Sequence, residues 1–264
     1  MKKVLMLPEE KIDVGMAALA FAKEIYPDLD IAAYSNKLDV LAEQVRQMSK
    51  ETKNPDQRIR CLNTVILLHE KYQGTKDLAT ARTSQMYYLN RVLDTKQGNC
   101  VSMPLLYIAV AERLGWPIYL VHVPDHSFVR YVDPALKEQN IEATSNGGTV
   151  SDEQYSKDFL VSQKGRKSGA YLRTLTHREL LGDLAAINGI SFARQKKRST
   201  AVAYLELATK LNPKNVAAWR NLAYAYHILA KHSKDEDAKK YAERIKVITK
   251  KLNELGFVDP KDIY

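Results

Sequence analysis

Cys100 combines a reactive side chain with a neighbourhood suited to nucleophilic chemistry. It follows Gly98-Asn99, where the chain can turn tightly, and it opens a long apolar segment that predicts a buried helix. The start of a helix favours the thiolate form of a cysteine, which is the nucleophilic form. The backbone N–H of Cys100 would also supply half of an oxyanion hole. Cys100 is therefore the candidate nucleophile.

A nucleophilic cysteine needs a base, and a histidine oriented by a third group is the usual one. His126 directly follows Pro124-Asp125 and begins a run rich in β-branched and aromatic residues, which predicts a strand. In a hairpin that turns at Asp133-Pro134, residue 126 faces residue 142 on the next strand. Glu142 is then placed to accept a hydrogen bond from the His126 ring. The pattern predicts a Cys–His–acid triad on a helix, a strand and the next strand.

Each of these residues also has a purely structural interpretation. Cys100 would be an inert buried cysteine, His126 a hydrogen-bonded core or turn histidine, and Glu142 an exposed carboxylate at a strand end. A second donor to the oxyanion hole has three candidates: Gln97, Tyr87 and Tyr88.

A zinc site formed by Cys100, His122 and His126 is a further alternative. Two histidines separated by three residues bind a metal together most readily on a helix. The flanks of this pair are strand-like and are interrupted by Pro124, which disfavours the zinc interpretation.

The elements that must position these residues follow from the hydrophobic pattern. The segment from Cys100 to Gly115 is apolar on nearly every side and must be buried, and Pro104 requires that helix to begin close to Cys100. Upstream of this segment, helices are predicted over 12–27, 37–48 and 57–72, with Asp30 as the cap of the second and Gly74 at the end of the third. A short helix is predicted within 84–99, and strands are predicted over 116–123, 126–132 and 139–144.

From about residue 177 the chain is helical again, and its small and aromatic residues recur at the spacing of tetratricopeptide repeats. The first unit contains Gly189, Phe192, Ala201, Leu205, Ala208 and Pro213, and the second begins with Trp219, Ala223 and Tyr226. An insertion at 232–237 displaces the last helix. Such hairpins bury their apolar faces only against neighbours, which predicts packing on the core or on a protein partner.

Composition excludes several classes of protein. The net charge is +9, but the 40 basic residues are interleaved with 31 acidic ones, which disfavours nucleic-acid binding. Two cysteines are too few for a disulfide scaffold, and Cys61 lies in a helical pattern that predicts a buried apolar role. The apolar runs are too short to span a membrane, and the first residues do not resemble a signal peptide. We expect a cytoplasmic protein, or an extracytoplasmic one if a leader has been removed.

These segments resemble a known family. Residues 93–131 and 140–148 resemble the core of transglutaminase-like proteins, in the bacterial branch that joins this core to tetratricopeptide repeats, and residues 11–47 resemble that branch's N-terminal helical region. The resemblance implies that Cys100 is the nucleophile and His126 the base. It places the acid in a motif similar to Asp-Pro-Thr, which here reads Glu142-Ala143-Thr144. The glutamate is a departure, and Asp133 is the rival for this role. Some members of the branch lack the cysteine, so its presence here favours chemistry.

Together these observations predict an α+β protein with a transglutaminase-like or papain-like core over 1–175 and tetratricopeptide-like hairpins over 176–264. The predicted function is a cysteine-dependent amide hydrolase or acyl transferase, closer to a peptidase than to a cross-linking enzyme. It would act on a peptide or protein without a cofactor or a metal. The alternative is a catalytically silent module whose repeats bind a protein partner, and solvent access to Cys100 distinguishes the two.

Overall fold

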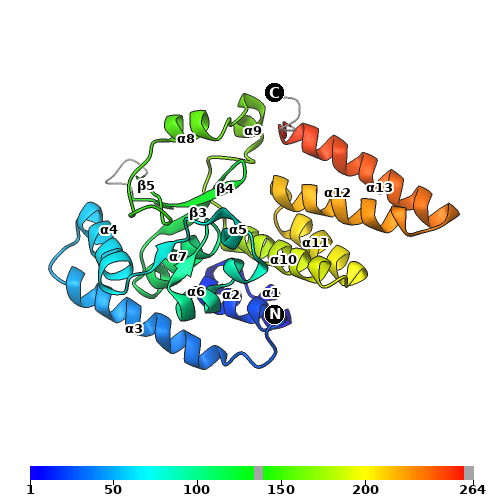
Figure 1. Ribbon diagram of the computed structural model, residues 1–264. Helices are drawn as coiled ribbons and strands as arrows, with labels where there is room; N and C mark the ends of the chain where they lie inside the picture. Colours follow the sequence, from blue (N-terminus) through cyan, green and yellow to red (C-terminus); the bar gives the residue numbers. More distant parts are fainter. Residues whose placement is uncertain (134–138, 259–264) are drawn as a thin grey trace.

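The computed structural model describes residues 1–133 and 139–258. Helices dominate, and they surround a three-stranded sheet in the middle of the molecule (Figure 1). Helix α7, Ser102–Arg113, packs against strands β3 and β4 on one side and against helices of the N-terminal region on the other. The observed class is therefore α+β, as the sequence predicts.

Four of the N-terminal helices begin at polar caps. Asp30 accepts a hydrogen bond from the Ala33 backbone N–H, 3.1 Å long, which confirms the predicted cap. Helix α6 follows further along the chain and leads into the segment that contains Cys100. The bounds are Lys2–Leu5 for α1, Val14–Ala22 for α2, Ile31–Ser49 for α3, Pro55–Asn63 for α4, Leu78–Ala81 for α5 and Leu89–Thr95 for α6.

The prediction of one continuous helix over 57–72 is wrong. Helix α4 gives way to a π-helix, Thr64–His69, and Gly74 does not end a helix. Gly74 belongs instead to the short strand β1, Gln73–Gly74, which pairs in parallel with β2, Gln97–Gly98. A Cβ on Gly74 would stand 2.5 Å from the Thr144 carbonyl oxygen, so only glycine allows this close approach. The constraint is tertiary, and local periodicity does not reveal it.

The sheet has the antiparallel order β3-β4-β5, with bounds Ile118–Val123, His126–Tyr131 and Gln139–Ile141. Val123 pairs with His126, so Pro124-Asp125 forms a two-residue turn in which Asp125 has a φ of 54°. The predicted pairing of 126 with 142 is wrong by two residues, because Val129 pairs with Ile141. Continuing that register sets Glu142 diagonal to His126. Pro134, in the predicted turn, lies outside the described residues.

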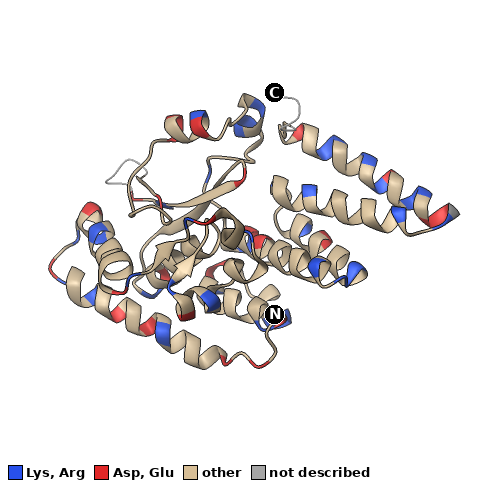
Figure 2. Ribbon diagram, viewed as in Figure 1, with Lys and Arg blue, Asp and Glu red and all other residues tan. Residues whose placement is uncertain are grey.

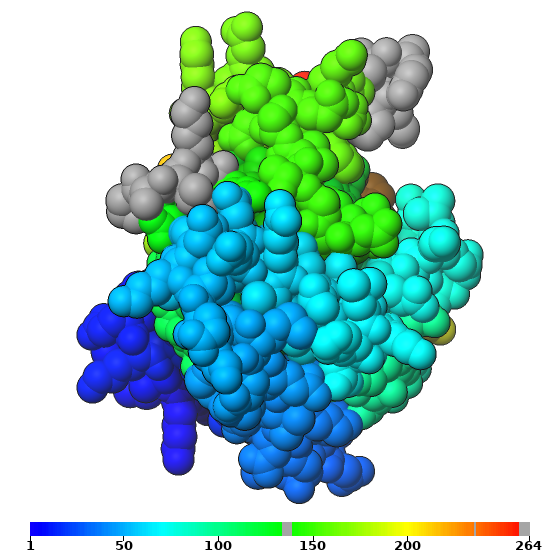
Figure 3. Space-filling view, turned by 90° about the vertical axis from the view of Figure 1, so that its left-hand side faces the viewer, coloured from blue at the N-terminus to red at the C-terminus, as the bar shows by residue number. Residues whose placement is uncertain are grey.

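Two short helices that the sequence did not predict follow the sheet. They are α8, Asp152–Asp158, and α9, Gln163–Ser168, and serine residues cap both. The chain then returns along the free edge of β3, where the Leu172 N–H donates to the His122 carbonyl over 2.9 Å. This segment and the N-terminal helices form the face seen in Figure 3, where the first is green and the second blue to cyan.

The C-terminal region forms consecutive helical hairpins (Figure 1). Gly189 lies in tight contact, because a Cβ there would stand 2.7 Å from Leu205 Cγ. Only the first half of the predicted insertion at 232–237 separates α12 from α13, because 235–237 belong to α13. The assignment of these hairpins as tetratricopeptide repeats stays a prediction. The bounds are His177–Arg194 for α10, Arg198–Leu211 for α11, Val216–Lys231 for α12 and Asp235–Glu254 for α13.

Helix α10 also packs against the N-terminal region. The Asn188 side-chain amide donates to the Phe21 carbonyl over 2.9 Å, and the Tyr88 hydroxyl donates to Asn188 Oδ1 over 3.0 Å. One cluster of buried apolar residues runs from the N-terminal helices through α7 and the sheet into α12. The predicted boundary between 175 and 176 falls one residue before the cap of α10, and it stays a prediction. Lys and Arg alternate with Asp and Glu over the helices (Figure 2).

The packing of α10 on α11 yields a prediction about stability. A Cβ on Gly182 would lie 2.9 Å from the Ala208 carbonyl oxygen and 2.9 Å from the Asn212 nitrogen, and backbone atoms cannot yield easily. Overpacking costs about 1–3 kcal/mol, and the better helix propensity of alanine offsets up to about 1 kcal/mol. We expect Gly182→Ala to lower the free energy of unfolding by about 1–2 kcal/mol in urea titrations followed by circular dichroism.

Gly148→Ala is the matched control, because the nearest atom to its Cβ is 3.8 Å away. This variant should unfold within about 0.5 kcal/mol of the wild type. Equal stability of the two variants would contradict the close packing described for α10.

Candidate active site

Cys100 lies in the turn between β2 and α7, two residues before the helix begins at Ser102. Asn99 fixes this turn, because its Oδ1 accepts hydrogen bonds from the N–H groups of Val101, 2.9 Å, and Ser102, 3.1 Å. The Ser102 hydroxyl in turn donates to the Met86 carbonyl over 2.6 Å. The sequence predicted that Cys100 itself opens the helix. The N-cap residue is instead Val101, and the Asn99 side chain fixes the turn in which Cys100 lies partly exposed.

Gly98 brings the strand close to the helix at this point. A Cβ there would meet Met103 Cγ at 2.8 Å and Ser102 Oγ at 2.9 Å. The Gly98 carbonyl accepts a hydrogen bond from the Thr75 N–H, 2.9 Å, which ties the segment to β1. Close contact on one side and strand pairing on the other therefore set the position of the cysteine.

His126 stands at the start of β4 with its ring mostly buried. Its Nε2 lies 2.7 Å from Glu142 Oε2, which leaves Nδ1 for a second partner. The Cys100 side chain lies near the ring and contributes to the raised pKa of His126. Phe159 stacks on the imidazole with ring centroids 4.8 Å apart and planes 8° from parallel. Glu142 thus holds one nitrogen of the ring, and Phe159 covers one face.

The Glu142 carboxylate accepts hydrogen bonds at both oxygens. Oε2 accepts from His126 and from the Tyr155 hydroxyl at 2.9 Å, and Oε1 accepts from the Thr144 N–H at 3.1 Å and the Thr144 hydroxyl at 2.5 Å. The Glu142 backbone is also paired with Gly148. Because the partners donate to the carboxylate, this arrangement suits an ionised carboxylate and a proton on His126 Nε2.

The pKa values of the two groups move in the directions expected of an ion pair. Burial alone would lower the pKa of His126, but hydrogen bonds and charge from Cys100 and Glu142 outweigh it and raise the pKa to about 9. Burial would raise the pKa of Glu142, but the His126 and Thr144 contacts hold it below its ordinary value. At neutral pH the ring is therefore an imidazolium facing a carboxylate.

The alternative acid and two of the three alternative oxyanion donors lie away from the Cys100 cavity. Asp133 follows the far end of β4, whereas His126 begins that strand. Tyr88 is buried and its hydroxyl contacts Asn188 and Ser191 of α10. Gln97 is exposed on β2, and Tyr87 lines the same cavity as Cys100. Of the three predicted donors, only Tyr87 faces that cavity in the described structure.

His122 and His126 do not converge on one point. His122 Nδ1 lies 2.8 Å from the Ser127 hydroxyl and Nε2 lies 2.7 Å from Asp183 Oδ2. Asp183 Oδ1 also accepts from the side-chain amides of Asn215, 2.6 Å, and Asn212, 3.3 Å. Within the described ranges, no three potential ligands gather as a metal site.

The sequence analysis missed this second polar cluster. The signal for it is Asp183, a carboxylate within an otherwise apolar stretch of α10 that the structure buries. A buried carboxylate requires partners, but the sequence does not say which ones they are. Cys61 also differs from its prediction, because it is half-buried and its thiol contacts the Met48 carbonyl at 3.7 Å.

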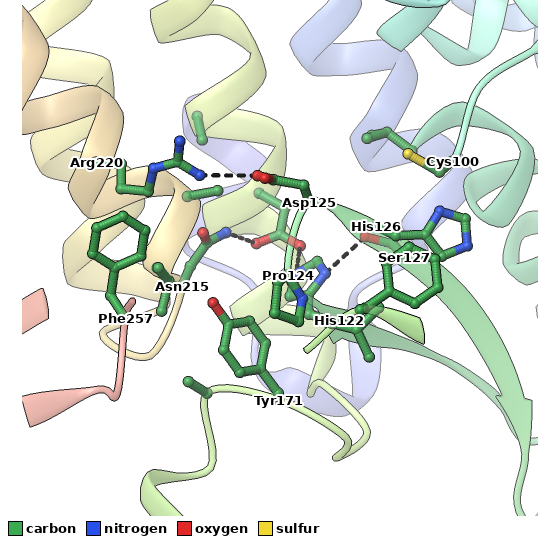
Figure 4. A pocket seen from close by; sticks show the side chains of 18 of the residues that line it. Cys100, His122, Pro124, Asp125, His126, Ser127, Tyr171, Asn215, Arg220 and Phe257 are labelled. Atoms are coloured by element: carbon green, nitrogen blue, oxygen red, sulfur yellow. Dashed lines mark hydrogen bonds and ion pairs between the residues drawn. The ribbon is translucent and has the colours of Figure 1, made fainter. Parts of the chain in front are cut away.

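A cavity of about 530 Å³ links the two polar clusters (Figure 4). Cys100 and His126 stand at one end, Arg220 of α12 and Phe257 stand at the other, and the β3–β4 turn lies between them. The cavity lining is mostly apolar and includes Leu120, Ile187 and Tyr171. The cysteine is therefore open to a bound molecule and is not sealed in the core.

Comparison with known proteins agrees with this architecture. The sequence model of the transglutaminase-like superfamily matches residues 32–185, which is more than half of the chain. The chain belongs to the transglutaminase-like superfamily. Members of this superfamily are typically cysteine-dependent enzymes.

The individual relatives and solved structures share little sequence identity with this chain. Two UPF0162 proteins of Xylella fastidiosa, from strains 9a5c and Temecula1, are each 26% identical, over 83% and 89% of this chain and 78% and 85% of their own. A TGase crystal structure is 14% identical with a TM-score of 0.37 over 53% of this chain and 42% of its own. A crystal structure of menin, reported to reveal its binding site for the Mixed Lineage Leukemia protein, is 10% identical with a TM-score of 0.44 over 90% and 71%.

No helix in the described part of the chain is both long and apolar enough to cross a membrane.

The contact between His126 and Glu142 predicts the titration of the ring. Glu142→Gln removes the negative charge while keeping the shape, so burial should dominate and the pKa of His126 should fall from about 9 to below 7. Imidazole ¹⁵N chemical shifts measured against pH would report the change. Asp133→Asn is the matched control and should leave the titration unchanged. A fall in the pKa in Asp133→Asn, with none in Glu142→Gln, would transfer the orienting role to Asp133.

The same ion pair predicts a pH dependence of stability. The pKa of folded His126 is raised above 6.5, so its stabilising contribution is complete below about pH 6.5 and is lost as the pH rises through about 9. Between pH 6 and 9.5 the wild type should lose on the order of 2–3 kcal/mol more unfolding free energy than Glu142→Gln. Urea unfolding at several pH values measures this difference, and parallel curves for the two proteins would refute it.

Proposed function

We propose that this protein is a cysteine-dependent amide hydrolase or acyl transferase, closer to a peptidase than to a cross-linking enzyme, and that Cys100, His126 and Glu142 form its catalytic triad. The observation that supports this most strongly is the hydrogen bond between the His126 ring and Glu142, with Cys100 lining the same cavity as His126. This trio opens onto the cavity through Cys100 and His126. Superfamily membership supports cysteine chemistry in general terms.

The reaction begins with the Cys100 thiolate and the His126 imidazolium. The sulfur attacks the carbonyl carbon of an amide, a C–S bond forms, and the carbonyl π electrons move to the oxygen. The backbone N–H of Cys100 and the Tyr87 hydroxyl are the proposed donors to this oxyanion. Glu142 keeps the imidazolium in place and stabilises its charge.

Collapse of the tetrahedral intermediate breaks the C–N bond. His126 gives its proton to the departing amine nitrogen, which leaves a thioester on Cys100 and a neutral imidazole. His126 then takes a proton from water, which attacks the thioester, and the C–S bond breaks to release a carboxylic acid. An amine in place of water would give acyl transfer through the same steps.

The alternative function, a silent module whose hairpins bind a protein partner, predicts a cysteine that solvent does not reach. Cys100 is partly exposed and lines the cavity, which favours the enzyme. The hairpins then serve as one wall of the proposed substrate site, because α12 lines the same cavity through Asn215, Val216 and Arg220.

Alkylation of Cys100 by iodoacetamide between pH 5 and 9 tests the proposed pair. We expect rapid labelling that persists at pH 6, far below the free-thiol pKa of about 8.5, and a loss of at least about tenfold at pH 6 in His126→Ala. Intact-protein mass spectrometry in a Cys61→Ser background gives the rates for Cys100 alone.

Cys100→Ala in that background should show no labelling and should keep its folding stability. Slow labelling with an ordinary thiol titration, unchanged by His126→Ala, would refute the proposed function and leave the hairpins as the functional part.

A further inference from the structure

The end of the cavity away from Cys100 contains an arginine that the proposed triad does not use. Arg220 of α12 points toward the β3–β4 turn, where its Nη1 lies 2.9 Å from Asp125 Oδ1 (Figure 4). Its guanidinium also stands over the Phe257 ring, 5.1 Å from the centroid. Among the cavity-lining residues within the described ranges, Arg220 is the sole lysine or arginine. An arginine in a mostly apolar lining is a recognition feature for an anionic group, and the carboxylates of Asp125, Asp158 and Asp183 line the same cavity.

The present partner of Arg220 is easily displaced. The Asp125 side chain is 72% exposed and that of Arg220 is 39% exposed, and ion pairs this open to solvent contribute little stability. Asp125 also sits in a tight turn at the tip of the hairpin, where it faces water. A carboxylate brought by a bound molecule could replace Asp125 at small cost and gain the bidentate geometry that arginine offers.

Fixed elements hold the arginine in place. Asn215 caps α12 through the Ala218 N–H, 2.7 Å, and binds Asp183 with its other side-chain group. The segment after α13 is held as well, because Ser162 Oγ donates to the Gly256 carbonyl over 2.8 Å. Arg220 and Phe257 therefore belong to walls that are anchored on both sides of the cavity.

The apolar surroundings add to the recognition. Tyr171, Phe257 and Val216 line the cavity beside Arg220 and offer surface to an apolar side chain. The exposed Asp158 of α8 lines the cavity too, and its carboxylate accepts a hydrogen bond from Gln154. It is next to Phe159, the residue that stacks on His126. Arg220 thus stands at the α12 end of the cavity, whereas His126 stands at the Cys100 end.

We propose that Arg220 is a specificity-determining residue that binds a carboxylate of a peptide substrate, several bonds away from the amide that Cys100 attacks. The inference rests on the proposed function, and it narrows the substrates to peptides that combine an acidic group with an apolar side chain. The carboxylate would be the C-terminal one or that of an acidic side chain. Phe257 and Tyr171 would pack against the apolar residue.

Electrophilic peptides of matched shape test the proposal. Chloroacetyl peptides of one to three residues containing leucine alkylate a cysteine by loss of chloride, and each is made with a free C-terminal carboxylate and as the neutral amide. For at least one length, we expect the acid to label Cys100 about tenfold faster than the amide at subsaturating concentration, as suits a hydrogen bond to a charged group. All rates are measured in the Cys61→Ser background.

Two further matched pairs identify the source of the carboxylate. In chloroacetyl peptide amides, the glutamate or its neutral match glutamine lies on the side of the departing amine in the proposed hydrolysis. In peptidyl chloromethyl ketones, the glutamate or glutamine lies on the side of the acyl group. A preference in the first series alone assigns a C-terminal carboxylate, and a preference for glutamate assigns an acidic side chain. Either result supports the proposal.

Variants of the ion pair complete the test. Arg220→Ala should abolish the acid preference, and Arg220→Lys should retain only part of it because lysine lacks the planar fork. Asp125→Asn should increase the preference, since it removes the competing carboxylate while asparagine tolerates the positive φ of the turn. Iodoacetamide, too small to bridge the cavity, should label all these variants at the wild-type rate.

Equal rates for acid and neutral probes in all three series, or an acid preference that survives Arg220→Ala, would overturn the inference. Failure of the proposed function has a different signature. An inactive thiol would react slowly with every probe, including iodoacetamide, while the acid-to-neutral ratio would still report on Arg220.

Discussion

Burial of helix α7 is the constraint on which the rest of the structure depends. Residues 102–111 are all buried, so the helix needs a cover on every side. The sheet supplies one side, and α2, α3 and α6 supply others. Each large apolar side chain removed from water contributes about 1.5–3 kcal/mol, which makes this helix the natural centre of the fold. Cys100 precedes it, so the same packing that stabilises the protein also fixes the thiol.

The polar end of α7 obeys the same constraint. Burial, with the nearby charge of Asp13, raises the pKa of Glu112 to about 8, although its Oε2 accepts a hydrogen bond from the Val14 N–H over 2.8 Å. His177, at the start of α10, lies 3.3 Å from the other oxygen. One hydrogen bond thereby joins the end of α7 to the start of α2, and His177 of α10 stands close to the same carboxyl group. Helix α10 itself packs on α2, where Asn188 donates to the Phe21 carbonyl.

The sequence predicted the central helix, the first two strands and the C-terminal helices because each has a clear local period. It placed the start of the central helix at Cys100, two residues before the observed start at Ser102. It also named Glu142 as the neighbour of His126, although the assumed strand register was wrong. The error is harmless because a shift of two residues keeps a side chain on the same face of a sheet. A shift of one residue would have turned Glu142 away from His126.

What the sequence could not predict depends on distant contacts. Gly74 looked like the end of a helix, yet its role is to let a strand approach Thr144. Helices α8 and α9 are too short for a period to emerge, and Phe159, which stacks on His126, follows α8. The partners of Asp183 come from β3 and from the turn before α12, which are far apart along the chain.

Side chains along β4 point alternately to the two faces of the sheet, so adjacent residues of this strand make different contacts. His126 and Ser127 are consecutive, so their side chains leave opposite faces of the sheet. One face directs His126 toward Glu142, while the other directs Ser127 toward His122 and, through it, Asp183. The first face carries the proposed chemistry, and the second attaches the helical hairpins by a carboxylate that also binds Asn212 and Asn215.

A buried carboxylate with this many partners is costly to separate from them, because a single lost partner leaves charge or polar groups unsatisfied. The hairpins are therefore not a loosely tethered addition to the core. Asn215 caps α12, so the contact that joins the hairpins to the sheet also sets the position of that helix along the cavity. A substrate of the proposed reaction that reached Cys100 from this side would have to fit a wall whose place is set by the Asp183 cluster, so the proposed site would draw on core and hairpins together.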